Sequence, residues 1–368
     1  MIHHDSRPYD IAATEAGRKM REKLQADIAA ASTKAKTAIT KIYDELPEDR
    51  SVDARALRFS FDERLRVTYG DGSNAEQETV HPWALGQMTQ AVGLRRDFIL
   101  DLLTGTGTWA HDLAVHNLNE FFAHQPTRHL CRSVKGELRG FLSPRYQRRH
   151  PGQLLEAFLA SCRRHGLLAY EAWCSDTRHG ARAMLDRIIE PVPNEPMAIG
   201  VYYGESPYGN GATELSISIQ RMWCTNQAII EQNLRQAHLG GLLPEDVTWS
   251  EETYQADTRL IATKLNDLLT SSVSNSALDR LVARVRAAHT KNLSPEQFQT
   301  FLTKNLNKTE AAAVTEIHRT GGVERLPPGD TVWRASNAIS FFAQGPELSD
   351  ERRIELQKLA GSLLPAAK

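Results

Sequence analysis

The chain has 368 residues, of which 41% are hydrophobic and 24% are charged, and its formal net charge is −1. This composition is typical of a globular protein with two or three domains and argues against nucleic-acid binding through overall positive charge. The sequence contains no run of about 18 apolar residues and begins with the polar stretch MIHHDSRPYD. We therefore expect no membrane span, no secretory signal and a cytoplasmic location. Four widely separated cysteines fit reduced thiols better than a disulfide framework: Cys131, Cys162, Cys174 and Cys224.

Hydrophobic spacing of three and four residues predicts one long helix over residues 9–46, with an alanine-rich apolar stripe. Period-two spacing over residues 55–69 predicts a β-hairpin. The stretch HPWALGQMTQAVG then begins a helical region, in which Pro82 occupies a first-turn position. The N-terminal third is therefore predicted to mix helices with a hairpin.

The middle of the chain is rich in β-branched and aromatic residues. It predicts strands over residues 167–174, 181–189, 197–203 and 213–222, separated by turn clusters such as PVPNEP and GESPYGNG. The following stretch, CTNQAIIEQNLRQAH, has helical spacing, with Thr225 or Asn226 as a natural N-cap. The predicted order at the end of this region is strand, strand, strand, helix.

The C-terminal third is predicted to be helical over residues 250–289, 294–302, 309–319 and 331–343, with a weak point at SSVSNS and a capping pattern at SPEQ. The fold class that follows is α+β: a central antiparallel sheet with a β-β-β-α core, a helical N-terminal arm and a helical C-terminal region. We expect an arm over residues 1–50, a mixed region over 51–130, a β-rich basic domain over 131–240 and a helical region over 241–368.

Positive charge is concentrated in one part of the chain. Residues 128–189 contain twelve Lys and Arg against five acidic residues, a net charge of +7, which leaves −8 for the rest of the chain. Eleven of the twelve are arginines, whose planar guanidinium suits phosphate groups and stacks on bases. A general bias of the genome toward arginine codons would produce the same excess, so charge alone leaves both interpretations open.

Aromatic residues are interleaved with these arginines, and stacking surfaces beside a basic groove are what sequence-tolerant binding of single strands requires. Many of the aromatics must instead belong to strands and core. Arg163 and Arg164 have another explanation, because cations compensate the dipole at a helix C-terminus. The candidate nucleic-acid-binding residues are Arg132, Lys135, Arg139, Arg145, Tyr146, Arg148, Arg149, Arg178, Arg182, Arg187, Tyr202, Tyr203 and Arg221. Arg221 with the expected helix start at Thr225 or Asn226 would form a further anion site.

Catalytic signatures are mostly absent. The sequence has no GxxxxGK[ST], HExxH or GxSxG motif, so we expect no ATP-driven motor, no catalytic residue and no cofactor. His124, His129 and Cys131 match no zinc module, and we expect no metal. A metal-dependent nuclease remains an alternative, and its carboxylates would come from Glu171, Asp176 and Asp186. A third possibility is an interaction factor whose long helices dock partners.

Several blocks of the sequence resemble a known family. LRGFLSPRYQRRHPGQLLEAF from Leu138 and SPYGNGATELSISIQRMWCTNQAI from Ser206 resemble the phage- and plasmid-like domain-of-unknown-function family 932. WALGQMTQAVGLRRDFILDLL, LAVHNLNEFF and TVWRASNAISFFAQ are similar to its N- and C-terminal parts. One departure is Gln227, which stands where a glycine would be expected after CTN.

The resemblance implies a mobile-element setting, with a role in replication, recombination or plasmid maintenance. The strand order over residues 181–238 is also similar to the core of the Rad fifty-two single-strand annealing superfamily, whose phage members work without ATP. Together these observations predict an ATP-independent protein that binds and anneals single-stranded DNA as a homo-oligomer. The alternatives are a DNA-processing nuclease and an interaction factor of a mobile element.

Overall fold

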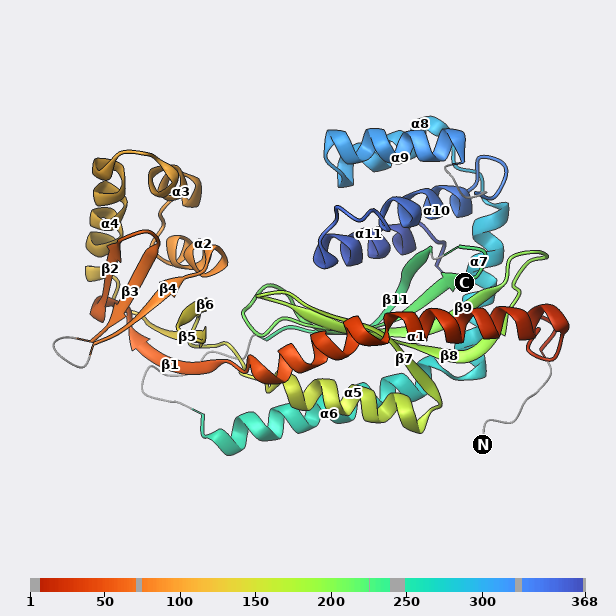
Figure 1. The fold of residues 1–368 in the computed structure, drawn as a ribbon, viewed down its shortest axis with the longest axis horizontal. Helices are drawn as coiled ribbons and strands as arrows, with labels where there is room; N and C mark the ends of the chain where they lie inside the picture. The colour runs from red at the N-terminus through yellow and green to blue at the C-terminus, as the bar shows by residue number, and fades with distance from the viewer. Residues whose placement is uncertain (1–6, 71–74, 225, 239–248, 322–325, 367–368) are drawn as a thin grey trace.

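The computed structural model describes residues 7–70, 75–224, 226–238, 249–321 and 326–366. It has two lobes, each built on its own β-sheet (Figure 1). The small lobe covers the described residues between 48 and 142, and the large lobe contains the N-terminal helix and the helices and strands described after residue 142. The α+β class predicted from the sequence is confirmed.

The small lobe contains a six-stranded sheet in the order β1-β5-β6-β4-β3-β2, with helices packed on one side. All neighbouring strands are antiparallel except β4 and β6. The predicted hairpin is β2 and β3, and the helix with proline in its first turn is α2. The elements are β1 (Glu48–Asp53), η1 (Ala54–Ala56), β2 (Leu57–Phe61), β3 (Leu65–Tyr69), β4 (Glu76–Val80), α2 (Pro82–Ala91), α3 (Arg96–Thr104), α4 (Thr108–Ala123), β5 (Arg128–Val134) and β6 (Glu137–Leu142).

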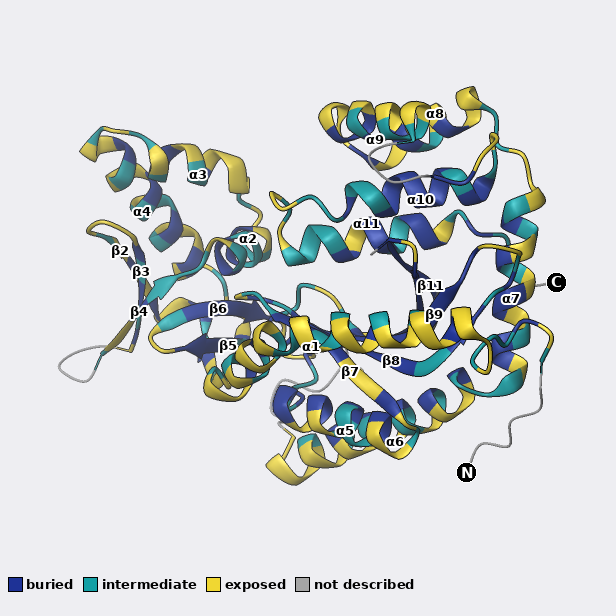
Figure 2. Ribbon diagram, turned by 45° about the vertical axis from the view of Figure 1, so that its right-hand side comes forward, coloured by how far each residue is buried: buried dark blue, intermediate teal, exposed yellow. Residues whose placement is uncertain are grey.

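The large lobe is organised around a five-stranded antiparallel sheet in the order β11-β10-β9-β8-β7. Long helix α1 (Glu15–Asp44) lies along β7 at the edge of this sheet (Figure 1). The central strand β9 is buried along its whole length (Figure 2). The strands are β7 (Leu167–Cys174), β8 (His179–Ile189), β9 (Met197–Glu205), β10 (Thr213–Arg221) and β11 (Gln227–Gln236).

Helices cover both faces of the large sheet. Phe158 of α5 stacks on Tyr203, with ring centroids 5.2 Å apart, and so marks the face that α5 and α6 cover. Ile354 of α11 packs with Tyr202 on the opposite face, since side chains of a strand alternate. The helices are α5 (Pro151–Arg164), α6 (Glu251–Ser272), α7 (Asn275–Thr290), α8 (Pro295–Asn305), α9 (Lys308–Thr320), α10 (Val332–Phe342) and α11 (Asp350–Ser362).

The segment after β10 corrects one prediction. Residues 227–236 form strand β11, which pairs with β10, and not the helix expected from their spacing. The β-β-β-α core is therefore a five-stranded meander. Thr225, one of the two expected N-caps, lies outside the described residues. Ile229 and Ile230 are β-branched and buried, so strand pairing and packing decided an ambiguous pattern.

The other helical predictions agree with the structure except at the start of the long helix, which begins at Glu15 and not at residue 9, because Asp10 forms a β-bridge with Ile189. The break expected at SSVSNS separates α6 from α7, and Ser294 and Gln297 form the predicted capping box of α8. Helix α11 was not predicted as a separate element. The domain boundary expected at residue 131 falls within β5, which pairs with β1 and β6 in the small sheet. None of the helices in the described ranges is long and apolar enough to cross a membrane.

Candidate nucleic-acid interface

Most arginines of the basic segment, and Arg221 outside it, are buried or half-buried and pair with acids that come largely from other parts of the chain. For most of them the charge is therefore compensated inside the molecule, although Arg178 shares its carboxylate with Lys358. The ion pairs are Arg132–Asp49 at 2.6 Å, Arg139–Glu45 at 2.8 Å, Arg149–Asp257 at 3.1 Å, Arg178–Glu214 at 3.9 Å, Arg182–Glu171 at 2.9 Å, Arg187–Asp10 at 2.7 Å and Arg221–Glu195 at 2.5 Å.

Arg132 shows why such residues do not reach a ligand. It is 3% exposed, donates to the Asp49 carboxylate and to the Pro207 carbonyl oxygen at 2.6 Å, and lies over the Tyr146 ring. Arg139 is held between Glu45 and Glu137, and these carboxylates raise the pKa of its guanidinium against the opposing effect of burial. Arg132 joins β5 to β1 and to Pro207 of the large lobe, and Arg139 joins the end of α1 to the small sheet. Neither arginine presents a free charge to a phosphate.

The anion site expected at Arg221 is also corrected. Its guanidinium makes a bidentate contact with Glu195 and is 6% exposed. The residues after Asn226 form a strand, so no helix N-terminus presents free amides there. The predicted phosphate contact has no structural basis at this position.

The three candidate tyrosines lie in the interior. Tyr202 and Tyr203 are 1% and 0% exposed, and Tyr146 is 5% exposed. Burial raises the pKa of all three phenols, so they remain neutral. The predicted stacking of bases on these rings is therefore corrected, because no ring face is open to a ligand.

Residues 143–150 form a loop that we call the basic loop. Two of its arginines lie at the surface. Arg145 is exposed, and its guanidinium makes no ion pair with any described residue. Arg148 is half-buried, and its guanidinium carbon lies 3.8 Å from the centroid of the Tyr254 ring. Arg148 also shares Asp49 with Arg132, so one carboxylate faces two cations. The basic loop therefore carries positive charge that the protein does not fully compensate.

Lys135 is a third exposed cation. It occupies the turn between β5 and β6, where its φ of 50° lies in the left-handed region. Its side chain is 66% exposed, and its ammonium lies 3.6 Å from the Glu45 carboxylate. An exposed pair of this kind contributes little energy, so the ammonium remains available to a ligand.

A buried cluster of polar and aromatic side chains connects the basic loop to the large sheet. His238 stacks on Tyr146, with centroids 4.9 Å apart, and its Nε2 lies 2.7 Å from the Glu205 carboxylate. The His238 charge and hydrogen bonds from His238 and Thr213 outweigh burial and lower the pKa of Glu205 to about 2. Arg149 donates to the Thr213 hydroxyl and to main-chain carbonyls at the end of β11. The loop therefore has a defined conformation.

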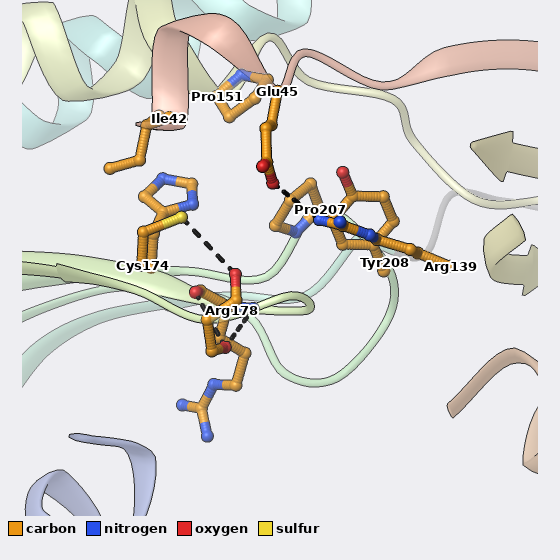
Figure 3. A pocket seen from close by; sticks show the side chains of 10 residues that line it. Ile42, Glu45, Arg139, Pro151, Cys174, Arg178, Pro207 and Tyr208 are labelled. Atoms are coloured by element: carbon orange, nitrogen blue, oxygen red, sulfur yellow. Dashed lines mark hydrogen bonds and ion pairs between the residues drawn. The ribbon is translucent and has the colours of Figure 1, made fainter. Parts of the chain in front are cut away.

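A small pocket lies beside this region, between the lobes (Figure 3). Its volume is about 20 Å³, which is room for roughly one water molecule. Its lining includes Glu45, Arg139, Cys174 and Tyr208, and burial raises the pKa of the Cys174 thiol to about 11. The pocket is too small for a substrate, and its thiol is not activated.

The carboxylates considered for a nuclease do not gather. Asp186 pairs with Arg21 and Asp176 pairs with Lys41, and these partners are twenty residues apart on α1, about 30 Å along the helix axis. Glu171 pairs with Arg182 instead. No group of three or more His, Cys, Asp or Glu side chains among the described residues is placed to hold a metal ion.

Sequence reasoning missed Tyr254, Glu205 and His238. Tyr254 follows Arg148 by more than a hundred residues, so no local spacing relates the two. Glu205 and His238 are polar residues at the ends of predicted elements, and only the meander brings them together.

No protein-family model, curated protein or solved structure matches the chain. The family resemblance therefore stays a prediction, and the similarity to the annealing core lacks the helix on which it was based, because residues 227–236 form β11.

Proposed function

We propose that the protein is an ATP-independent, non-catalytic protein that binds single-stranded nucleic acid of a phage or plasmid through the basic loop. The observation that carries this proposal is Arg145, an exposed arginine without an acidic partner among the described residues, beside Arg148 stacked on Tyr254. Exposed guanidinium groups next to an aromatic ring suit a phosphate backbone with stacked bases. Annealing of two strands in recombination or replication is the activity that we expect from such binding.

Fluorescence anisotropy with a labelled oligothymidylate at low salt tests this proposal. We expect binding by the wild-type chain and a several-fold weaker affinity for Arg145→Ala, because one phosphate contact is removed. Arg163→Ala is the matched control, since Arg163 is exposed at the last turn of α5 and lies outside the basic loop. Absence of binding by the wild type, or equal losses in both variants, would contradict the proposal.

We also propose that the protein self-associates through α4, as an annealing protein would. Trp109, Leu113 and Phe121 are 69%, 38% and 43% exposed and lie on one ridge with four-residue spacing. Asn117, the remaining residue of the ridge, folds back to donate to the Leu113 carbonyl oxygen. In an antiparallel pair, Trp109 of each copy would meet Phe121 of the other.

Light scattering measures this association directly. We expect a dimer or larger assembly for the wild type and a lower mass for Trp109→Ala. Trp223→Ala is the control, because Trp223 is 57% exposed in another part of the molecule. An unchanged mass for Trp109→Ala would exclude α4 as the contact.

A further inference from the structure

Two glycines face each other on the side of the large sheet that α11 covers. Gly180 of β8 pairs with Gly204 of β9, and the same row continues to Trp173 on one side and Glu214 on the other. A Cβ at Gly180 would lie 2.7 Å from Trp173 Nε1, and one at Gly204 would lie 2.7 Å from the Tyr202 hydroxyl and 2.8 Å from Glu214 Oε1. Glycine is therefore required at both positions, because polar side-chain atoms lie directly over the backbone.

Hydrogen-bond donors outnumber acceptors at this place. The indole N–H of Trp173 and the hydroxyl of Tyr202 are buried and have no hydrogen-bond partner among the described residues. Buried polar groups in folded proteins normally have a partner, so two donors without one in the same place point to a site for a polar ligand. Tyr202 is neutral, since burial raises its pKa, and its hydroxyl can therefore donate.

Two cations share a single carboxylate beside these donors. Lys358 of α11 pairs with Glu214, and its ammonium lies 5.4 Å from the centroid of the Tyr202 ring. The guanidinium of Arg178 reaches the same carboxylate only at 3.9 Å, its single ion pair among the described residues. The Arg178–Lys358 cluster, defined as Arg178, Tyr202, Glu214 and Lys358, therefore has a net charge of +1 when all groups hold their ordinary charges.

Solvent reaches the cluster from the side of its cations. The Lys358 side chain is 30% exposed and the Arg178 side chain 15%, whereas Glu214 is 7% exposed. The Arg178 guanidinium points away from the pocket between the lobes (Figure 3). The neighbouring arginine on the same face, Arg182, differs because Glu171 neutralises it at 2.9 Å.

We infer that the Arg178–Lys358 cluster binds a phosphate group, either as free inorganic phosphate or as the terminal phosphate of a nucleic acid. The Arg178 fork and the Lys358 ammonium would hold the charged oxygens, and the Tyr202 hydroxyl would donate to one of them from the floor of the site. This site is distinct from the basic loop and does not depend on oligonucleotide binding there.

Calorimetric titration with inorganic phosphate tests the site itself. We expect millimolar or tighter binding by the wild type and at least about tenfold weaker binding by Arg178→Gln and Lys358→Met, because a charge-assisted contact is lost in each. Arg163→Gln and Lys34→Met are matched controls with exposed cations outside the site, and we expect changes below about twofold.

Tyr202→Phe keeps the test decisive if a charge variant fails to fold. It removes one unpartnered hydroxyl and should weaken phosphate binding by about three- to tenfold while leaving the folded structure intact. No heat for wild-type protein at about 10 mM phosphate, or equal affinities for Tyr202→Phe and wild type, would overturn the inference.

Oligonucleotides with a 5′-phosphate or a 5′-hydroxyl separate the two sources of phosphate. Tighter binding of the phosphorylated strand that is lost in Lys358→Met assigns the site to a nucleic-acid terminus. Equal binding of both strands, together with a positive phosphate titration, assigns it to free phosphate. Failure of all oligonucleotide binding would overturn the proposed function and leave the phosphate titration as the test of this site.

Discussion

Arg145 and Arg149 lie in the same loop and have opposite environments. Arg149 is 3% exposed and binds Asp257 and several main-chain carbonyls, whereas Arg145 faces solvent. We expect Arg149→Met to lower the free energy of unfolding by about 3 kcal/mol, since it leaves the Asp257 carboxylate without its partner. Arg145→Met is the matched control and should change it by less than about 0.5 kcal/mol. Urea unfolding measures both, and equal effects would contradict the structural assignment.

The buried side chain of His179 is expected to make the folded state less stable in acid. It is 3% exposed, and burial lowers its pKa from an ordinary value of 6.5 to about 4 despite the nearby Glu205 carboxylate. The unfolded chain therefore binds a proton at a higher pH than the folded chain, so stability is present above pH 6.5 and is lost as the pH falls toward 4. The loss is about 3 kcal/mol.

The measurement is the free energy of unfolding from urea titrations between pH 7 and 4. We expect His179→Gln to show a shallower fall than the wild type over this range. Other buried histidines, such as His129, act in the same direction, so the difference between the two proteins isolates His179. Parallel curves would show that His179 is protonated to the same extent in both states.

At the scale of elements, Asn119 protects the exposed edge of the small sheet. Its amide accepts from the Phe59 N–H at 2.8 Å and donates to the Phe59 carbonyl oxygen at 3.1 Å, which occupies the free groups of edge strand β2. We expect Asn119→Ala to cost about 1–2 kcal/mol and to promote self-association through this edge. His116→Ala, at an exposed position of the same helix outside the ridge of Trp109 and Phe121, should cost less than about 0.5 kcal/mol.

Chemical denaturation and the concentration dependence of light scattering check both effects. A loss of stability in Asn119→Ala without concentration-dependent growth in mass would show that α4 itself covers the edge. Equal stability of the two variants would contradict the role of Asn119.

The sequence predicted individual helices and strands better than it predicted which of them pair. Long α1, the β2–β3 hairpin and the strands from β7 to β10 carry strong periodicity, which depends on neighbours in the chain. The ten residues of β11 have a pattern compatible with helix and strand, and pairing with β10 decides between them. Strands β5 and β6 are adjacent in sequence to the large lobe, yet they pair with β1 and β4.

The candidate site was less predictable for the same reason. Arg145 and Arg148 were expected in a loop and are found there. Whether an arginine is free depends on acids far away in the sequence, such as Asp49 and Asp257, and a single chain does not reveal that pairing. Tyr202 and Tyr203 are buried because both faces of β9 are covered, and Tyr146 is buried against His238.

For the whole molecule, the separation of charge along the chain has a structural role. The segment of residues 128–189 has a net charge of +7, and the acids that neutralise its arginines come largely from other segments, including Asp10 and Glu45 near the N-terminus. These pairs join the segment before α1 to β8, the end of α1 to the small sheet, and the basic loop to α6. Because these pairs are buried or half-buried, removal of one partner lowers the free energy of unfolding. Most of the basic segment therefore stabilises the fold, and a minority of it is free to bind a ligand.

The salt dependence of oligonucleotide affinity tests this account most directly. For single strands, the slope of log K against log salt concentration is about −0.7 for each phosphate contact. Three of the candidate cations lie at the surface, the exposed Lys135 and Arg145 and the half-buried Arg148, and they predict a slope of about −2. Binding through all ten predicted cations would give about −7 and would contradict the structural role of the buried arginines, and no binding at low salt would contradict the proposed function.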